Sequence, residues 1–169
     1  KTIQDIKGGT GAKIFLFGSI FGGTGASGFP TIANLISKKL KELQPEGKLK
    51  NIKLGGGLVL PYFSFIFEGQ DTELKAKSED FLMNTQVGLK YYHLTSTTDI
   101  YDAVYLFGDE SQSPVSTASL GGNTQRNEPH FIELYAALSA IDFFAKENSQ
   151  NYHLIARNNQ NQLHWPDLP

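Results

Sequence analysis

Residues 13–43 read KIFLFGSIFGGTGASGFPTIANLISKKLKEL and contain the clearest succession of structural patterns in the chain. The stretch opens with an apolar run of eight residues, which is typical of a strand buried on both faces. Four glycines follow within residues 22–28, and Pro30 then stands where a helix would begin, because the first turn tolerates its missing N–H. Apolar residues at helical spacing continue to the Gln-Pro-Glu-Gly of 44–47. The stretch predicts a strand, a glycine-rich loop and a helix in succession.

The rest of the chain alternates between apolar and helical patterns. Apolar segments predict a strand that runs into a loop at 52–67, and further strands at 102–107 and 152–157. Helical patterns predict helices at 71–92 and 130–147, with a long polar loop at 108–129 between them. Buried strands that alternate with helices predict an α/β fold, with a mostly parallel, Rossmann-like sheet and helices on both faces. Such sheets bind ligands beyond the carboxyl ends of their strands, where the glycine loop is expected to lie.

Composition restricts the classes of function. The 169 residues suffice for one domain with a core, and 40% of them are apolar, which is a globular composition. The formal charge of -2 argues against non-specific binding to nucleic acid or to an anionic membrane. The absence of cysteine excludes thiolate metal sites, and the four histidines have no carboxylates at ligand spacing, so no protein-built metal site is expected. No apolar run approaches the roughly 20 residues of a membrane span.

The glycine loop has a functional and a structural interpretation. It consists of Gly22, Gly23, Thr24, Gly25, Ala26, Ser27 and Gly28. Its backbone N–H groups could converge on a phosphate at the positive end of the helix, with hydroxyls from Thr24 and Ser27. Alternatively, the glycines allow a tight turn and close packing of the helix on the strand, and Ser27 caps the helix. The loop lacks the lysine of a Walker A motif, which argues against that class.

A dinucleotide-binding domain is one class that the loop allows. Gly22, Gly25 and Gly28 fit a G-x-x-G-x-x-G spacing that some NADP-binding families use. However, the chain contains no Tyr-x-x-x-Lys pair for short-chain dehydrogenase chemistry. An NADP-binding Rossmann domain therefore stays as an alternative.

The loop resembles more closely that of the tubulin/FtsZ superfamily, which reads G-G-G-T-G-[ST]-G and precedes a helix. Here Phe21 replaces the first glycine, and Ala26-Ser27 replaces the usual Thr/Ser-Gly, while Gly-Gly-Thr-Gly is kept. Later features follow in the order of that family. PYFSFIFEG at 61–69 is similar to its strand ending in P-F-x-F-E-G, and VYLFGD at 104–109 is similar to its strand ending in Asn-Asp. QLHWPDL at 162–168 resembles its catalytic loop, N-L-D-F-A-D-V.

This resemblance implies a cytoplasmic GTPase of the bacterial tubulin-like kind, which binds GTP or GDP with Mg²⁺ and assembles head to tail into filaments. The glycine loop would hold the phosphates. Contacts to the nucleotide sugar and base are expected from Glu68, Asn127, His130, Phe131 and Glu133. Asp167 matches the second aspartate of the catalytic loop, which acts on the nucleotide of the neighbouring subunit.

Departures from the family pattern leave a second interpretation open. His164 replaces the first catalytic aspartate, and Thr72 stands where the family has an arginine. A nucleotide-binding scaffold without catalysis would fit these departures. The chain also starts at Lys1 without Met, and the family's first glycine loop and its C-terminal domain have no counterpart here. We therefore expect 1–169 to be a partial GTPase domain that is inactive alone.

Overall fold

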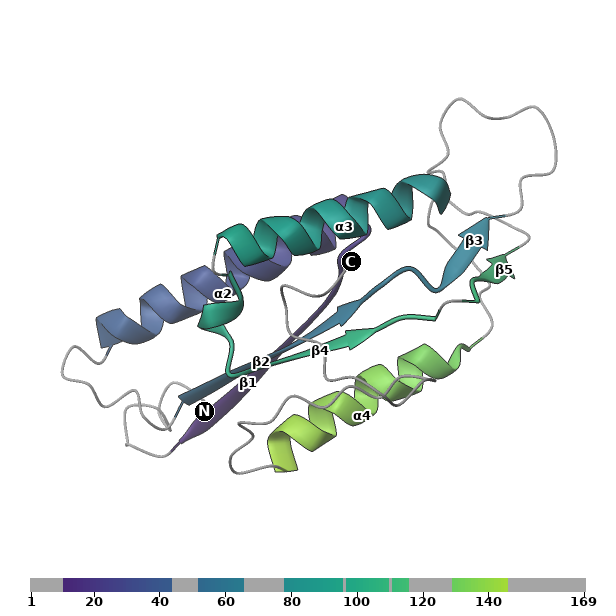
Figure 1. The fold of residues 1–169 in the computed structure, drawn as a ribbon. Helices are drawn as coiled ribbons and strands as arrows, with labels where there is room; N and C mark the ends of the chain where they lie inside the picture. Colours follow the sequence, from purple (N-terminus) through teal and green to yellow (C-terminus); the bar gives the residue numbers. More distant parts are fainter. Residues whose placement is uncertain are drawn as a thin grey trace, which may run out of the picture.

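The computed structural model describes residues 11–43, 52–65, 78–95, 97–109, 111–115 and 129–145. These residues form an α/β fold around a three-stranded parallel sheet (Figure 1). The sheet consists of β1 (Ala12–Ser19), β2 (Ile52–Val59) and β4 (Ala103–Phe107), in the order β1-β2-β4. Both neighbouring pairs run parallel, which confirms the predicted parallel α/β sheet.

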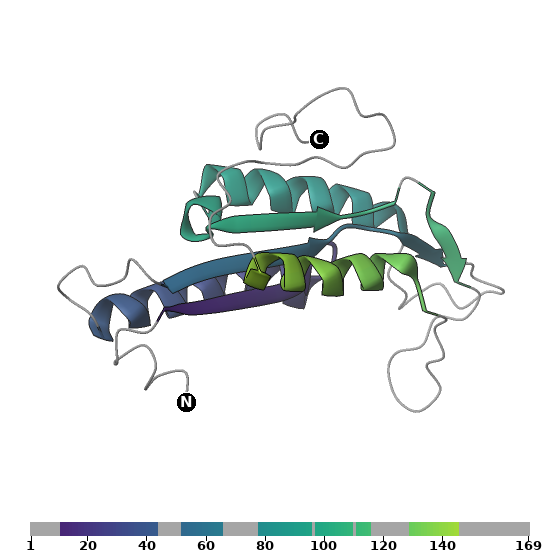
Figure 2. The same cartoon turned by 90° about the horizontal axis from the view of Figure 1, so that it is seen from below.

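Helices cover both faces of the sheet, also as predicted (Figures 1 and 2). One face carries α2 (Gly23–Leu43) and α3 (Ser78–Leu94), followed by the short 3₁₀ helix η2 (Thr97–Ile100). The other face carries α4 (Phe131–Ala145). No helix among the residues described here is both long and apolar enough to cross a bilayer.

A second, two-stranded sheet extends from the first. It pairs β3 (Phe63–Phe65) with β5 (Ser113–Val115) in parallel. The segment 52–67, predicted as a strand running into a loop, contains β2 and then β3, and β5 lies in the stretch 108–129 that was predicted to be loop. The strand predicted at 152–157 lies outside the described residues.

The core lies between the sheet and the α2–α3 layer. Its largest fully buried side chains are Tyr92, Ile20 and Leu58. Phe29 of α2 stacks on Tyr101 and Tyr92, with ring centroids 4.6 and 6.0 Å apart respectively. A methyl group on Gly56 of β2 would overlap the Phe29 ring and lie 2.9 Å from Tyr101 Cε1. A glycine in the middle strand therefore makes room for this aromatic stack.

The start of α2 corrects a prediction from the sequence. The helix begins at Gly23, so Pro30 lies inside it and Gly23–Gly28 belong to its first turns rather than to a loop. Pro30 cannot donate the helical hydrogen bond to the carbonyl of Ala26. The hydroxyl of Tyr92, from α3, donates to that carbonyl instead, at 2.5 Å. A donor from another helix thus lets α2 continue past the proline.

Replacing Tyr92 by Phe should lower the free energy of unfolding by about 1–2 kcal/mol, because the Ala26 carbonyl would lose its donor. Urea unfolding measures this change. Tyr91→Phe is the matched control, since Tyr91 is the next residue and is 56% exposed; it should change stability by less than about 0.5 kcal/mol. Equal losses in both variants would contradict the role given to Tyr92.

The pH dependence of this difference provides a second check. Burial raises the pKa of Tyr92 to about 12, above its ordinary value of 10.0. The folded state therefore holds the Tyr92 proton more tightly than the unfolded state does. The contribution of Tyr92 is complete below pH 10 and is lost as the pH rises towards 12. The stability difference between wild type and Tyr92→Phe should shrink over that interval.

Candidate functional site

The carboxyl ends of β1, β2 and β4 meet at one edge of the sheet, because the three strands are parallel (Figure 1). β1 passes through Ile20, Phe21 and Gly22 directly into the first turn of α2. At the same edge, β2 continues through Tyr62 into β3, and β4 continues to Asp109. This edge is where parallel α/β sheets bind their ligands.

The glycines of 22–28 have different structural roles. A methyl group on Gly25 would lie 2.8 Å from Ser19 N, 3.0 Å from Ser19 C and closer still to Ser19 O. Gly25 is therefore explained by the close packing of α2 on the end of β1. In contrast, a methyl group on Gly23 would meet nothing within 4 Å. On Gly22 and Gly28 it would make only ordinary contacts, at 3.7 and 3.9 Å.

The backbone conformation does not explain these three glycines either. Gly22, Gly23 and Gly28 do not adopt the left-handed conformation that favours glycine. Within a helix, moreover, each glycine costs about 1 kcal/mol relative to alanine. The missing side chain at Gly23 therefore leaves open space beside the N-terminus of α2, and Gly22 next to it has room for a methyl group. A ligand could approach the backbone closely at this point.

The N-terminus of α2 has the electrostatics of an anion site. Ala26 N donates to Gly22 O at 2.9 Å, so the N–H groups before Ala26 precede this first helical hydrogen bond. The first turn contains no acidic residue, so no carboxylate offsets the positive end of the helix dipole. Thr24 is exposed there and can offer its hydroxyl. Ser27 does not cap the helix, because its Oγ donates to Gly23 O at 2.7 Å within α2.

The residues predicted for the base, His130, Phe131 and Glu133, lie at the start of α4. The imidazole of His130 caps this helix: its Nδ1 accepts from the backbone N–H of Ile132 at 3.2 Å. Its Nε2 lies 3.1 Å from Ser113 Oγ in β5. Both ring nitrogens of His130 therefore already have partners within the protein. Phe131 is half exposed and Glu133 is exposed, so these two side chains are better placed to contact a ligand.

A series of ring contacts connects the glycine segment with the start of α4. Phe21 contacts Phe63, Phe63 contacts Tyr62, Tyr62 contacts His130 and His130 contacts Phe131, with centroid distances of 5.7, 5.1, 4.8 and 4.4 Å in that order. The structure therefore joins two parts of the predicted site that are far apart in the sequence.

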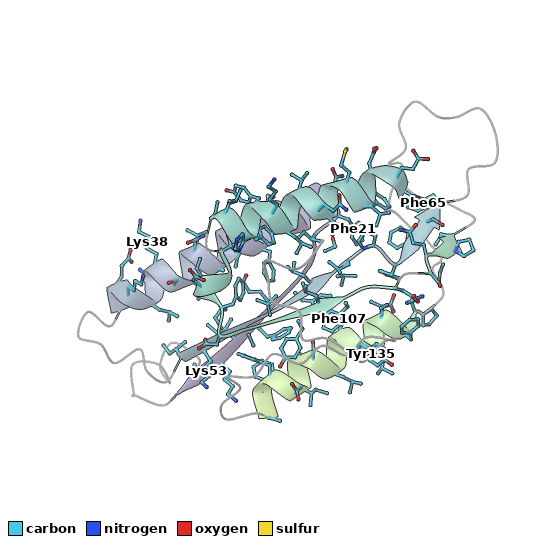
Figure 3. All side chains as sticks on the ribbon, in the orientation of Figure 1. Phe21, Lys38, Lys53, Phe65, Phe107 and Tyr135 are labelled. Atoms are coloured by element: carbon cyan, nitrogen blue, oxygen red, sulfur yellow. The ribbon has the colours of Figure 1, made fainter. Side chains whose placement is uncertain are left out.

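Phe81, in the first turn of α3, supports one end of this series. Its ring lies 5.2 Å from Phe21 and 6.0 Å from Phe65, and both partners lie near that end of α3 in Figure 3.

Tyr62 was not among the predicted site residues, although it belongs to the PYFSFIFEG segment that resembles the family motif. Tyr62 is half-buried, and its ring lies 4.8 Å from that of His130, next to the start of α4. Burial raises the pKa of Tyr62 above its ordinary value, and the nearby Glu133 carboxylate raises it further. Tyr62 therefore stays protonated at neutral pH and can donate a hydrogen bond in this part of the site.

Three predicted site residues, Glu68, Asn127 and Asp167, lie outside the described residues. Asp109, at the end of β4, accepts a hydrogen bond from Ser111 N at 3.0 Å, as in a turn. Within the described part of the chain, no three His, Asp or Glu side chains are grouped so that they could hold a metal ion.

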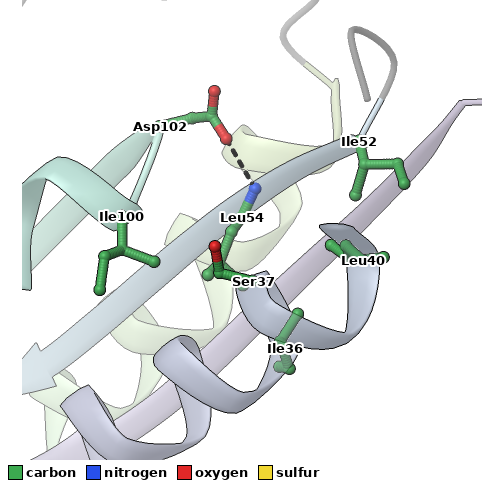
Figure 4. A pocket seen from close by; sticks show the side chains of 7 residues that line it. All are labelled: Ile36, Ser37, Leu40, Ile52, Leu54, Ile100 and Asp102. Atoms are coloured by element: carbon green, nitrogen blue, oxygen red, sulfur yellow. Dashed lines mark hydrogen bonds between the residues drawn. The ribbon is translucent and has the colours of Figure 1, made fainter. Parts of the chain in front are cut away.

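A shallow depression of about 130 Å³ lies at the opposite edge of the sheet (Figure 4). Its walls are mostly aliphatic and come from Ile36, Ser37, Leu40, Ile52, Leu54, Ile100 and Asp102. The Asp102 carboxylate accepts from Leu54 N at 2.7 Å, while Asp102 N donates to Leu54 O at 2.8 Å. The carboxylate therefore extends the pairing of β2 with β4, which is a structural role.

Models of protein families, curated proteins and solved structures give no match to this chain. Its function is therefore inferred from its own residues and their geometry.

Proposed function

We propose that this chain binds a guanine nucleotide at the carboxyl edge of its sheet and belongs to a tubulin/FtsZ-like GTPase that assembles head to tail. The observation that carries the proposal is that neither packing nor backbone conformation requires glycine at positions 22 and 23, and that the space beside Gly23 is open. This space lies at the N-terminus of a 21-residue helix whose first turn has no acidic side chain. Such a helix end favours phosphate oxygens.

The order of the elements also supports the proposal. β1, the glycine segment and α2 are followed by β2, β4 and α4, and the three strands are neighbours in that order. The tubulin/FtsZ resemblance implies the same succession along the chain. The ring contacts from Phe21 to Phe131 further bring the proposed phosphate end and the proposed base end to one edge.

In this proposal, the backbone of Gly22 and Gly23 and the hydroxyl of Thr24 bind the β- and γ-phosphates. Mg²⁺ would be held mainly by those phosphates and would neutralise their charge. Phe131 and Glu133 would contact the base. Tyr62, which was not predicted as a site residue from the sequence, would act beside them as a hydrogen-bond donor. Glu68, Asn127 and Asp167 keep the roles that the resemblance implies. Hydrolysis would depend on positioning and charge stabilisation, with Asp167 acting on the next subunit's nucleotide.

Titration of the full-length protein with a fluorescent GTP analogue, followed by competition with GTP, ATP and NADPH, tests the proposal. Displacement by GTP alone is the expected result. Displacement by NADPH alone would instead support a dinucleotide-binding Rossmann domain. In the full-length protein, GTP hydrolysis that rises steeply with protein concentration would distinguish a GTPase with a shared site from a scaffold that only binds nucleotide.

Gly23→Ala should raise the Kd for the nucleotide about tenfold, because a methyl group would displace the phosphates from the backbone N–H groups. The same change should leave the fold intact or stabilise it by up to about 1 kcal/mol, because α2 gains a better helix former.

Gly28→Ala is the matched control for binding. Gly28 lies further along α2 and also has room for a methyl group, 3.9 Å from Ile32 Cδ1. Gly28→Ala should leave the fold intact as Gly23→Ala does, and it should change the Kd for the nucleotide by less than about threefold. An unchanged Kd in folded Gly23→Ala would exclude the first turn of α2 as the phosphate site.

A further inference from the structure

Helix α3 lies beside α2 on one face of the sheet and contacts the connection from β1 into α2 (Figure 1). Gly88 of α3 packs against the buried Ile20, because a methyl group on Gly88 would lie 2.9 Å from Ile20 Cγ1. Further along α3, the hydroxyl of Tyr92 donates to the carbonyl of Ala26. The segment that leads from β1 to the proposed phosphate site is therefore held from one side by α3.

Ala26 links the Tyr92 hydroxyl to the turn that would bind the phosphates. The N–H of Ala26 donates to Gly22 O at 2.9 Å and closes the first turn of α2. The carbonyl of Ala26 accepts from Tyr92, because Pro30 has no N–H to offer it. Two hydrogen bonds, one on each side of Ala26, thus connect α3 with the proposed site.

The first two turns of α2 depend on support from outside the helix. Three of the six residues at 23–28 are glycine, which stabilises a helix less than any other residue except proline. Pro30 removes one of the hydrogen bonds that would join these turns to the rest of α2. Gly25 packs on Ser19 of β1 without a hydrogen bond to replace the missing one. Tyr92 supplies that hydrogen bond.

We propose that Tyr92 is a positioning residue of the phosphate site, which holds the first turn of α2 in the conformation that binds the anion. The proposal rests on the proposed function of Gly22 and Gly23. A ligand binds only the fraction of molecules in which this turn is ordered, so loss of the hydroxyl should raise the apparent Kd. Because Tyr92 belongs to another helix, the affinity of the site depends on how α3 lies against α2.

Titration of the full-length protein with the fluorescent GTP analogue tests this role. Tyr92→Phe should raise the Kd about fivefold. Tyr101→Phe is the matched control, because the Tyr101 hydroxyl also donates to a carbonyl of α2, that of Phe29, at 2.8 Å. That carbonyl keeps its helical donor, the N–H of Ala33. Tyr101→Phe should therefore change the Kd by less than about twofold.

Pro30→Ala separates positioning from a general loss of stability. Alanine at position 30 supplies the N–H that the Ala26 carbonyl lacks, so the Tyr92 hydroxyl is no longer needed there. In the Pro30→Ala background, Tyr92→Phe should change the Kd by less than about twofold. Circular dichroism checks that each variant is folded.

Hydrogen exchange measures the order of the turn in the absence of nucleotide. In full-length Tyr92→Phe, the amides of 22–28 should exchange about fivefold faster than in wild type. In Tyr101→Phe, the same amides should exchange at close to the wild-type rate. Unchanged exchange in Tyr92→Phe would overturn the proposal.

Three binding results would also overturn the proposal. They are an unchanged Kd in Tyr92→Phe, an equal rise in Tyr101→Phe, and an effect of Tyr92→Phe that is as large with Pro30→Ala as without it. Gly23→Ala shows whether the proposed function fails as well. If Gly23→Ala raises the Kd and Tyr92→Phe does not, the phosphate site stands and Tyr92 does not position it. An unchanged Kd in folded Gly23→Ala would remove the site and the role of Tyr92 together.

Discussion

Gly25→Ala is expected to lower the free energy of unfolding by about 3 kcal/mol or more, which is a large share of the stability of a small domain. Gly25 lies where the backbone of α2 crosses the end of β1. An added methyl group would lie 2.8 Å from Ser19 N, 3.0 Å from Ser19 C and closer still to Ser19 O. Because these are backbone atoms of a paired strand, no side-chain rotation can relieve the overlap. The helix and the strand would have to separate.

Urea unfolding followed by circular dichroism measures this effect. Gly23→Ala is the control, because it adds the same methyl group to the same turn of α2, where nothing lies within 4 Å. The two variants should therefore change stability in opposite directions or by very different amounts. A Gly25→Ala protein as stable as wild type would show that α2 does not pack on Ser19 in this way.

Phe29→Ala is expected to cost about 3–5 kcal/mol. Phe29 is 5% exposed and stacks on the rings of Tyr92 and Tyr101, above Gly56 of the middle strand. Removing the ring would leave a cavity, and Gly56 cannot fill it because it has no side chain. The two tyrosines are also held in place by hydrogen bonds from their hydroxyls to α2, so they cannot easily collapse into the space.

Phe131→Ala is the control for Phe29→Ala in the same unfolding experiment. Phe131 is 50% exposed, and its removal should cost less than about 1 kcal/mol. Gly56→Ala gives a second check, because its methyl group meets the Phe29 ring. In the Phe29→Ala background, Gly56→Ala should cost less than it does in wild type. If the losses in free energy of unfolding of the two single variants were additive in the double variant, the Phe29 ring would not lie against position 56.

The parallel sheet and its covering helices could be predicted from sequence because their signals are local. The apolar runs that became β1, β2 and β4 are bounded by turn residues and alternate with helical patterns. The start of α2 was predicted wrongly for the opposite reason. The rule that places proline in the first turn considers only neighbouring residues. The donor that lets the helix continue past Pro30 comes from Tyr92, in another helix.

The candidate site could be predicted in part. The glycines and the start of α4 were identified from local patterns and from the family resemblance. The contact series through Phe63 and Tyr62 depends on β3 and β5, each three residues long. Strands this short give no reliable periodic pattern. The different roles of Gly23 and Gly25 could not be predicted from the sequence either, because the two glycines differ only in their neighbours in the folded structure.

The hydrogen bond from Tyr92 to Ala26 has an evolutionary consequence. With proline at position 30, the hydroxyl at position 92 is the group that donates to the Ala26 carbonyl, so losing this hydroxyl has a cost in stability. If position 30 carries a residue with an N–H, the carbonyl has a local donor, and phenylalanine at position 92 costs less. In descendants of this chain, the two positions should therefore change as a pair, with the loss of Pro30 preceding the loss of the Tyr92 hydroxyl.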